Sequence, residues 1–400
     1  MSDSTVILNA RLSQPTPETE QFQIVIERGR VKSVVPMNWD RAVSASASVL
    51  DVEGDWISAG AVDLQINGAL GLAFPDLSAA HFELLQTICE WLWQQGIDGF
   101  CPTLVTTSPA NFRESLAVIA AFQRQQKETE NSSQIVGVHL EGPFLNPAKR
   151  GAHPADYLQP LTLASVKALI GDFAETVQIV TLAPEMEQSA DGSVIEWLCE
   201  QGITVSLGHS LATAEQAKRA FDQGATMVTH AFNAMPALHH REPGLLGAAI
   251  ADPRISCGFI ADGQHICPAM LDLLLRTHRG GTSRQADGLL GGLFLVSDAL
   301  SPLGLPDGFY PWDVRQIEVT GGTARLADGT LSGTTLPLIA GAINLVNWGL
   351  CSVDEAIALV STNPRQAIGL TRDILGNSTQ LMRWRQDANT QQLSWQRLDL

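Results

Sequence analysis

Five acidic or imidazole side chains stand at or just beyond the ends of short apolar runs. The run IVGVHLE ends at Glu141, ITVSLGH at His209, TMVTH at His230 and GLFLVSD at Asp298, and His265 follows ISCGFIA in the segment ADGQH. A lone histidine in such a place is more often a hydrogen-bonded structural residue, and a lone glutamate before Gly-Pro is as often an exposed turn residue. Several such groups at equivalent places predict one shared site.

The residue types indicate which chemistry that site would perform. One carboxylate and two imidazoles form a three-ligand set that leaves an open position for water, as in catalytic zinc centres. Water is a poor nucleophile at neutral pH, and coordination lowers its pKa from about 15.7 to roughly 7. We therefore expect Glu141, His209 and His230 to bind one divalent cation. Asp298 would take the proton of the water and later deliver it to the leaving group.

The elements that must position these residues are eight short apolar runs, most of them followed by a helical stretch. Helix starts are marked by Ser108 before Pro109, and by Thr213 with Gln216 three residues later as a capping box. This alternation is typical of an α/β protein with a (β/α)₈ TIM-like barrel, whose active site lies at the C-terminal ends of the strands. The eight runs are residues 56–66, 99–107, 135–141, 177–183, 203–209, 226–230, 255–261 and 292–298.

The two ends of the chain are predicted to form a second, smaller unit. The segments TVILNARL, FQIVIERGRVKSVVP and VLDVEGDW alternate between apolar and polar residues and indicate antiparallel strands. The closing segment STQLMRWRQDANTQQLSWQRLDL alternates again and could pair with them. We expect residues 1–57 and 369–400 to form a small β-sandwich domain and residues 58–368 to form a metallohydrolase barrel.

Composition excludes several classes of partner. The chain has 400 residues and a formal net charge of −17, which argues against nucleic acid or an anionic membrane surface as partner. Its six cysteines contain no C-x-x-C pair, as expected in a reducing compartment. No apolar window approaches the length of a membrane span, and the N-terminus lacks the basic and apolar regions of a signal peptide. We expect a cytoplasmic protein.

A series of short motifs closely resembles the N-acetylglucosamine-6-phosphate deacetylase family of the amidohydrolase superfamily. The resemblance covers roughly residues 56 to 370, whereas the Gln-rich C-terminal stretch departs from the family pattern. The motifs, in chain order, are DLQINGALG (63–71), PTLVTTS (102–108), GVHLEGPFLN (137–146), KRGAH (149–153), VTLAPE (180–185), LGHSLAT (207–213), THAFNAM (229–235), REPGLLGA (241–248), ADGQH (261–265), VSDA (296–299) and TLSGT (330–334).

The segment DLQING indicates a single metal ion. Amidohydrolase barrels commonly carry an H-x-H pair at the end of the first strand, but Gln65 and Asn67 stand there in this chain. None of the five lysines ends a proposed strand, so no carbamylated lysine is available to bridge two ions. We expect one divalent ion per subunit, most simply zinc, although iron, manganese and cobalt suit the same ligands.

The resemblance also implies roles for individual residues. It implies that Glu141, His209 and His230 bind the metal, that Asp298 is the catalytic acid and base, and that Gln65 orients water. Arg241 resembles an arginine that reaches the phosphate of substrate in a neighbouring subunit, which implies a homodimer. Asn67 remains without a role, and the adjacent His239 and His240 match no ligand position. The residues implied to bind substrate are Ala152, His153, Asn233, Ala234, Arg241, His265 (which would hold and polarise the acetyl carbonyl), Leu331, Ser332 and Gly333.

The expected activity is the metal-dependent removal of acetate from N-acetyl-D-glucosamine 6-phosphate, which leaves D-glucosamine 6-phosphate in amino-sugar catabolism. One alternative is a related amidohydrolase that acts on an unphosphorylated N-acyl amino acid or a cyclic amide, in which Arg241 and Asn233 would have no role. Another is a non-catalytic paralogue that binds an amino-sugar phosphate. Such a protein would be expected to have lost Asp298, which this chain retains.

Overall fold

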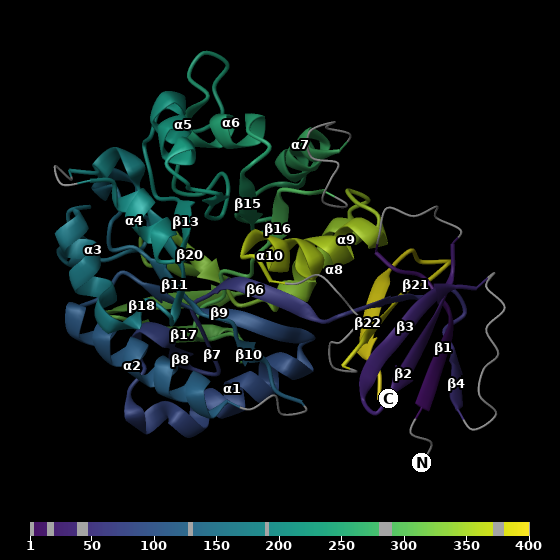
Figure 1. Cartoon of the computed structure of the whole chain (residues 1–400). Coiled ribbons are helices and arrows are strands. Elements are labelled where there is room, and N and C mark those ends of the chain that lie inside the picture. The colour runs from purple at the N-terminus through teal and green to yellow at the C-terminus, as the bar shows by residue number, and fades with distance from the viewer. Residues whose placement is uncertain are drawn as a thin grey trace.

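The protein contains a barrel of eight parallel strands surrounded by helices, with a separate group of strands from the two chain ends beside it (Figure 1). The computed structural model describes residues 4–13, 20–37, 47–126, 131–188, 192–279, 290–370 and 380–399. The predicted fold class is confirmed. The barrel strands, in chain order, are β6 (Ala61–Ile66), β9 (Ile97–Val105), β11 (Val138–Glu141), β12 (Val177–Leu182), β13 (Thr204–Leu207), β14 (Met227–Val228), β15 (Ser256–Phe259) and β16 (Leu293–Leu295).

The barrel strands read as apolar runs because helices cover them outside and side chains fill them inside. All six residues of β6 are buried, for example. Leu64, Ile179, Ile260 and Phe294 belong to the cluster of buried residues that includes the inner faces of the strands. A larger apolar cluster joins strands to helices. The helices are α1 (Phe82–Gln94), α2 (Pro109–Gln125), α3 (Leu163–Ile170), α4 (Val194–Glu200), α5 (Ala214–Asp222), α6 (Gly244–Ala251), α7 (Pro268–His278), α8 (Leu338–Asn347), α9 (Val353–Val360) and α10 (Thr362–Ala367).

The capping signals are confirmed at both predicted helix starts. The Ser108 side chain accepts a hydrogen bond from the backbone N–H of Asn111, and α2 begins at Pro109. Thr213 and Gln216 form the reciprocal capping box that begins α5. These caps fix where the chain leaves the strand ends and enters the helices.

The barrel closes between its first and last strands at the C-terminal rim. The backbone N–H of Asp298 donates to the carbonyl of Gln65 (2.9 Å), and that of Asn67 donates to the carbonyl of Ala299 (2.7 Å). The buried carboxylate of Asp63 accepts from the N–H of Ser297 (3.2 Å), which adds a third link across the seam. Gln65, Asn67 and Asp298, three polar residues singled out in the sequence, therefore lie on the line where the barrel closes.

A four-stranded antiparallel sheet is inserted between the eighth strand and α8. It is formed by β17 (Gly308–Trp312), β18 (Arg315–Thr320), β19 (Thr323–Leu326) and β20 (Leu331–Thr334). Residues 331–333, which the resemblance implies bind substrate, therefore lie in a strand. The alternation of buried and exposed residues along β18 shows that one face of this sheet is covered and the other is open to solvent.

The chain ends meet in two further sheets. β1 (Ser4–Ala10), β2 (Phe22–Glu27), β3 (Arg30–Pro36) and β4 (Ser48–Asp51) form one sheet, and β5 (Trp56–Ser58), β21 (Met382–Gln386) and β22 (Leu393–Arg397) form the other. The N-terminal purple strands and C-terminal yellow strands lie together beside α8 and α9 (Figure 1). The predicted pairing of the two ends is confirmed by β5 and β21. The domain boundaries at 57/58 and 368/369 stay a prediction, and residues 371–379 lie outside the described residues.

Three details of the strand predictions were wrong. The run 56–66, predicted as the first barrel strand, forms two strands, of which β5 belongs to the sheet of the chain ends and only β6 (Ala61–Ile66) belongs to the barrel. The N-terminal strands are not all antiparallel, because β4 pairs with β1 in parallel. The predicted third barrel strand is broken at Gly137 into β10 (Gln134–Ile135) and β11. Gly137 has a φ of 136°, and a Cβ there would lie 2.4 Å from the Cβ of Gln178, so only glycine fits this break.

Candidate active site

The predicted site residues converge at the rim, but only one of them ends a strand. Glu141 is the last residue of β11, whereas His209 and His230 lie two residues beyond β13 and β14 and Asp298 lies three beyond β16. The φ angles of these last three are 49°, 28° and 48°, in the left-handed region that non-glycine residues rarely adopt. The turned backbone places these side chains at the mouth of the barrel, where the residue pattern alone had suggested simple strand ends.

Three side-chain atoms that could each bind a metal ion lie close together. Oε1 of Glu141 lies 3.1 Å from Nε2 of His209 and 3.0 Å from Nε2 of His230, and the two imidazole nitrogens are 3.0 Å apart. All three residues are at most 5% exposed. Zinc ligands at about 2.0–2.1 Å on adjacent corners of a tetrahedron are separated by about 3.3 Å. The spacing therefore fits a small divalent cation.

The tautomer of His209 supports the same conclusion. Its Nδ1 lies 2.8 Å from the carbonyl oxygen of Lys149, which accepts but cannot donate, so Nδ1 carries the hydrogen. In the neutral ring, Nε2 then presents a lone pair to His230 and to the Glu141 carboxylate. A backbone carbonyl behind a ligating histidine is a common way of fixing its tautomer in metal sites. The donor set is thus suited to a positive ion.

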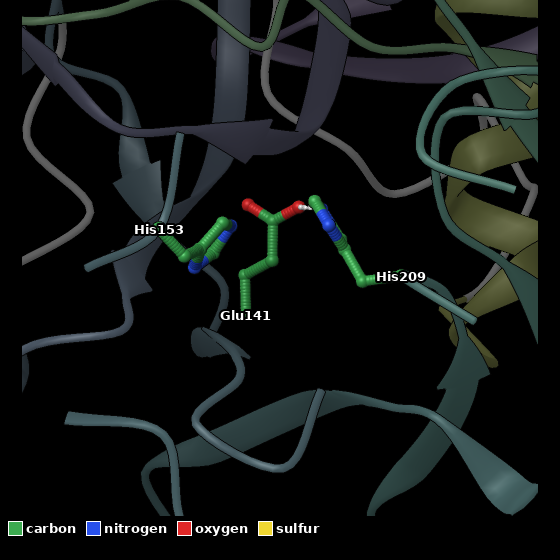
Figure 2. Close-up of side chains that lie close together, drawn as sticks. All are labelled: Glu141, His153 and His209. Atoms are coloured by element: carbon green, nitrogen blue, oxygen red, sulfur yellow. Dashed lines mark hydrogen bonds and ion pairs between the residues drawn. The ribbon is translucent and has the colours of Figure 1, made fainter. Parts of the chain in front are cut away.

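His153 packs edge-on against the ring of His209, with ring centroids 4.6 Å apart. Figure 2 shows these two histidines gathered around Glu141. One ligand atom from each of these three residues lies within 4.8 Å of the others, so His153 is a possible additional ligand, although the triad with His230 is tighter. Nδ1 of His153 accepts a hydrogen bond from the N–H of Thr106 (3.3 Å), and burial beside His209 lowers the pKa of His153 to about 3. His153 is therefore neutral.

A buried carboxylate stands beside the donor cluster. Oδ1 of Asp298 accepts hydrogen bonds from Nδ2 of Asn67 (2.8 Å) and Nε2 of Gln65 (3.2 Å), and Gln65 also donates to Oε1 of Glu141 (3.1 Å). Burial and the negative charge of Glu141 raise the pKa of Asp298 to about 6. Burial also opposes ionisation of Glu141, but the imidazoles of His209 and His230 beside it outweigh burial and hold the pKa of Glu141 well below its usual range. The two carboxylates thus differ in proton affinity, and Asp298 is the one that gains and loses a proton more readily near neutral pH.

A pocket of about 390 Å³ opens over these groups, a size suited to a small-molecule ligand. The inserted sheet forms part of its wall through Trp312, Asp313 and β20. Arg315 of this sheet donates to the carbonyl of Ala152 (2.6 Å) and so fastens the sheet to the loop after β11. The predicted residues that line the pocket are Glu141, Ala152, His153, His209, His230, Asn233, Ala234, His265, Asp298, Leu331 and Ser332.

Two predicted residues near the pocket act through the backbone. Gly333 has a φ of 149°, and a Cβ there would lie 2.6 Å from the carbonyl oxygen of Asp298, so glycine lets β20 approach Asp298. The carbonyl of Ala234 accepts a hydrogen bond from the N–H of Ser210, next to His209. His265 is fixed by a hydrogen bond between its Nδ1 and the carboxylate of Asp262 (2.7 Å).

Arg241 does not line this pocket in the described part of the chain. It lies on the exposed loop between β14 and α6, where its guanidinium contacts Nε2 of His240 (3.0 Å). This loop extends outward beside α5 and α6 (Figure 1). Among the described lining residues, Lys149 is the one permanent cation, whereas Asp76, Glu141, Asp298 and Asp313 are acidic.

Sequence reasoning missed two supporting residues. Glu185 accepts hydrogen bonds from Asn146 Nδ2 (2.9 Å), Ser210 Oγ (2.6 Å) and the N–H of Leu211 (2.5 Å), and so joins the loops around His209. His139 connects the carbonyl of Leu64 to Thr181 beneath the site. Both stand in quoted motifs, VTLAPE and GVHLEGP, but their types alone did not separate them from surface or core residues.

The chain belongs to the Amidohydrolase family, which residues 56–374 match. It is 34% identical over 354 residues to N-acetylglucosamine-6-phosphate deacetylase of Danio rerio, covering 86% of this chain and 83% of that protein. It is 31% identical over 351 residues to N-acetylgalactosamine-6-phosphate deacetylase of Escherichia coli O157:H7, covering 88% and 86%. The crystal structure of N-acetylglucosamine-6-phosphate deacetylase from Pasteurella multocida superposes with a TM-score of 0.81 at 25% identity, covering 99% of this chain and all of that one.

Proposed function

We propose that this protein hydrolyses the acetamide of N-acetyl-D-glucosamine 6-phosphate to D-glucosamine 6-phosphate and acetate. The observation that carries the proposal is the convergence of Glu141, His209 and His230 beside the buried, proton-carrying Asp298 at the bottom of one pocket. The relatives named above act on N-acetylhexosamine 6-phosphates, which supports this substrate class.

The roles of the residues follow from their contacts. A divalent cation held by Glu141, His209 and His230 would supply Lewis acidity, which lowers the pKa of water and polarises the amide carbonyl. Asp298 takes a proton from the attacking water at its carboxylate and returns it to the amide nitrogen as the C–N bond breaks. Gln65 holds Asp298 and Glu141 in fixed relation, because one amide group donates to both. His265, fixed by Asp262, would hold the acetyl carbonyl.

We propose one divalent ion per chain, with zinc as the expected ion. The amides of Gln65 and Asn67 occupy the positions from which a second ion would need imidazole ligands. Elemental analysis of the purified protein should find about one tightly held ion per chain, as three strong ligands and one open position imply. Two stoichiometric ions that are both lost with activity on chelation would contradict this proposal.

Binding the phosphate requires a positive charge, and Lys149 is the one permanent cation among the described residues that line the pocket of one chain. We propose a homodimer in which Arg241 from the exposed loop reaches the phosphate bound in the neighbouring subunit. Arginine suits this role because its planar guanidinium binds phosphate through two hydrogen bonds. The acidic residues of the pocket would otherwise repel the substrate.

Acetate release from a substrate panel tests the proposed activity. The panel should contain N-acetylglucosamine 6-phosphate, N-acetylgalactosamine 6-phosphate, unphosphorylated N-acetylglucosamine, an N-acyl amino acid and a cyclic amide. N-acetylgalactosamine 6-phosphate is the second candidate, because a relative of similar coverage acts on it. Preference for an unphosphorylated compound would favour the alternative amidohydrolase, and binding without turnover would favour a non-catalytic paralogue.

Subunit mixing tests the position of Arg241. Arg241→Ala should lower kcat/KM for the phosphorylated substrate by roughly ten- to a hundredfold, as expected for a charge-assisted contact, and should hardly affect the unphosphorylated sugar. Arg276→Ala, at an exposed arginine on α7, is the matched control. Heterodimers of Arg241→Ala and Asp298→Asn subunits should regain activity, because one of their two sites combines both intact residues. No rescue in verified heterodimers would place Arg241 in the site of its own chain.

We further propose a cytoplasmic location, supported by the finding that the six cysteines, all within the described ranges, form no disulfide. No helix in the described ranges has both the length and the apolar character that a membrane crossing requires. We also retain the division into a small domain of residues 1–57 and 369–400 and a barrel of residues 58–368. Limited proteolysis that cleaves near residue 58 or 369 and leaves an intact barrel fragment would support those boundaries.

A further inference from the structure

Asn67, which has no role in the mechanism above, lies in the wall of the pocket with an unused hydrogen-bond acceptor. Only 1% of the residue is exposed, and it is one of the lining residues. Its backbone is fixed on both sides, because its N–H donates to the carbonyl of Ala299 (2.7 Å) and its carbonyl accepts from Phe74 (2.9 Å). The side chain therefore starts from a rigid position on the seam of the barrel.

The orientation of the Asn67 amide is decided by its neighbour. An ionised carboxylate accepts hydrogen bonds but cannot donate them, so the atom 2.8 Å from Oδ1 of Asp298 must be the nitrogen, Nδ2. Oδ1 of Asn67 is then buried with no hydrogen-bond partner among the described residues. A buried acceptor without a donor is costly and rare, which indicates that a bound molecule supplies the donor.

The donor must be a group that lies beside Asp298 when substrate is bound. Asp298 has to reach the amide nitrogen in order to protonate it, and Asn67 is hydrogen-bonded to the same oxygen of Asp298. The scissile nitrogen of a secondary amide carries one N–H. We propose that Oδ1 of Asn67 accepts a hydrogen bond from this N–H, and that Asn67 is a substrate-binding residue that selects secondary amides over the corresponding esters.

This contact would also direct the proton transfer. After water adds to the carbonyl carbon, the nitrogen becomes pyramidal, keeps its N–H and gains a lone pair. If the N–H is bound to Asn67, the lone pair is turned towards Asp298. The proton that Asp298 took from water then moves to nitrogen, the C–N bond breaks, and amine and acetate leave. The inference rests on the proposed amide hydrolysis and adds an acceptor to it.

The test compares the natural amide with an ester that lacks the N–H, 2-O-acetyl-glucose 6-phosphate. Asn67→Ala should lower kcat/KM for the amide about tenfold more than for the ester. Gln65→Ala is the matched control, because Gln65 also donates to Asp298 (3.2 Å) but does not line the main pocket among the described residues. It should lower the rates for both substrates by similar factors. An equal amide-to-ester ratio in the Asn67→Ala and Gln65→Ala variants would overturn the inference.

A second variant separates the two ends of the Asn67 side chain. Asn67→Asp keeps an acceptor but loses the donor to Asp298, so it should be slow yet retain more of the preference for the amide than Asn67→Ala. In an Asp298→Asn background, where turnover is slow enough to measure binding, Asn67→Ala should weaken the affinity for the amide and leave that for the ester unchanged. Equal weakening of both ligands would also overturn the inference. If the unaltered protein hydrolyses no acetamide of the panel, the proposed function itself fails, and the role of Asn67 fails with it.

Discussion

Replacing Glu185 should weaken metal binding although Glu185 is not itself a ligand. Its carboxylate accepts hydrogen bonds from Ser210 and Leu211, the two residues after His209, and from the side chain of Asn146. The backbone N–H of Asn146 in turn donates to the carbonyl of His209 (3.0 Å). All three contacts therefore hold the same turn, in which His209 has a φ of 49°.

The size of the effect follows from the number of hydrogen bonds that Glu185 accepts around His209. Glu185→Ala removes all three of them, and loss of groups that orient a ligand typically weakens metal affinity by about 10–100-fold. That factor corresponds to about 1.4 to 2.7 kcal/mol. Glu185→Gln keeps the shape and one acceptor oxygen, so its loss should be smaller. Without the Glu185 carboxylate, Asn146, Ser210 and Leu211 would lose the contacts that keep His209 next to Glu141 and His230.

Competition with a coloured chelator at fixed pH measures the dissociation constant of the metal in each variant. Glu187→Ala is the matched control, since Glu187 lies two residues further on and accepts a bond from the N–H of Val194 at the start of α4. It should leave metal affinity within about threefold of the unaltered protein. Equal metal affinity in folded Glu185→Ala and Glu187→Ala would refute the reasoning.

Further expectations concern the proton carrier, a ligand and the small domain. Asp298→Asn should lower kcat by at least about a hundredfold with metal content unchanged; near-normal turnover would contradict its role. Burial and Glu141 raise the pKa of Asp298 to about 6, and a bound cation would lower it. Because Asp298 must be ionised to take a proton from water, kcat/KM should fall as the pH drops to 6 or below, and it should not fall at higher pH. His230→Ala should lose the ion in elemental analysis. Arg397→Ala should lower the free energy of unfolding in urea by about 2–3 kcal/mol, because a largely buried Arg397 binds Asp98 (2.9 Å), whereas the exposed Arg385→Ala should cost less than about 1 kcal/mol.

Much of the fold was predictable because each barrel strand is covered on both faces and must be apolar along its length. The same pattern placed Glu141, His209, His230 and Asp298 at one rim, since the ends of parallel strands meet there. The inserted sheet was not predicted, because only β18 alternates clearly between apolar and polar residues, while the strands beside it are short or contain glycine or proline. Glu185 was missed for a different reason. The residue type alone does not distinguish a glutamate that accepts three hydrogen bonds from a glutamate exposed to solvent.

The left-handed backbone at His209, His230 and Asp298 affects which substitutions natural selection would favour at these three positions. Each non-glycine residue in that region costs roughly 1–2 kcal/mol, a cost that glycine largely avoids. A chain with glycine at these positions would relieve backbone strain, although it would lose two of the three proposed metal ligands and the proposed proton carrier. Selection for robustness alone would therefore favour loss of the site, and only the demand for turnover keeps these residues in place. Degenerate copies of the gene should accumulate glycine at these three positions earlier than at Glu141, whose backbone is not left-handed.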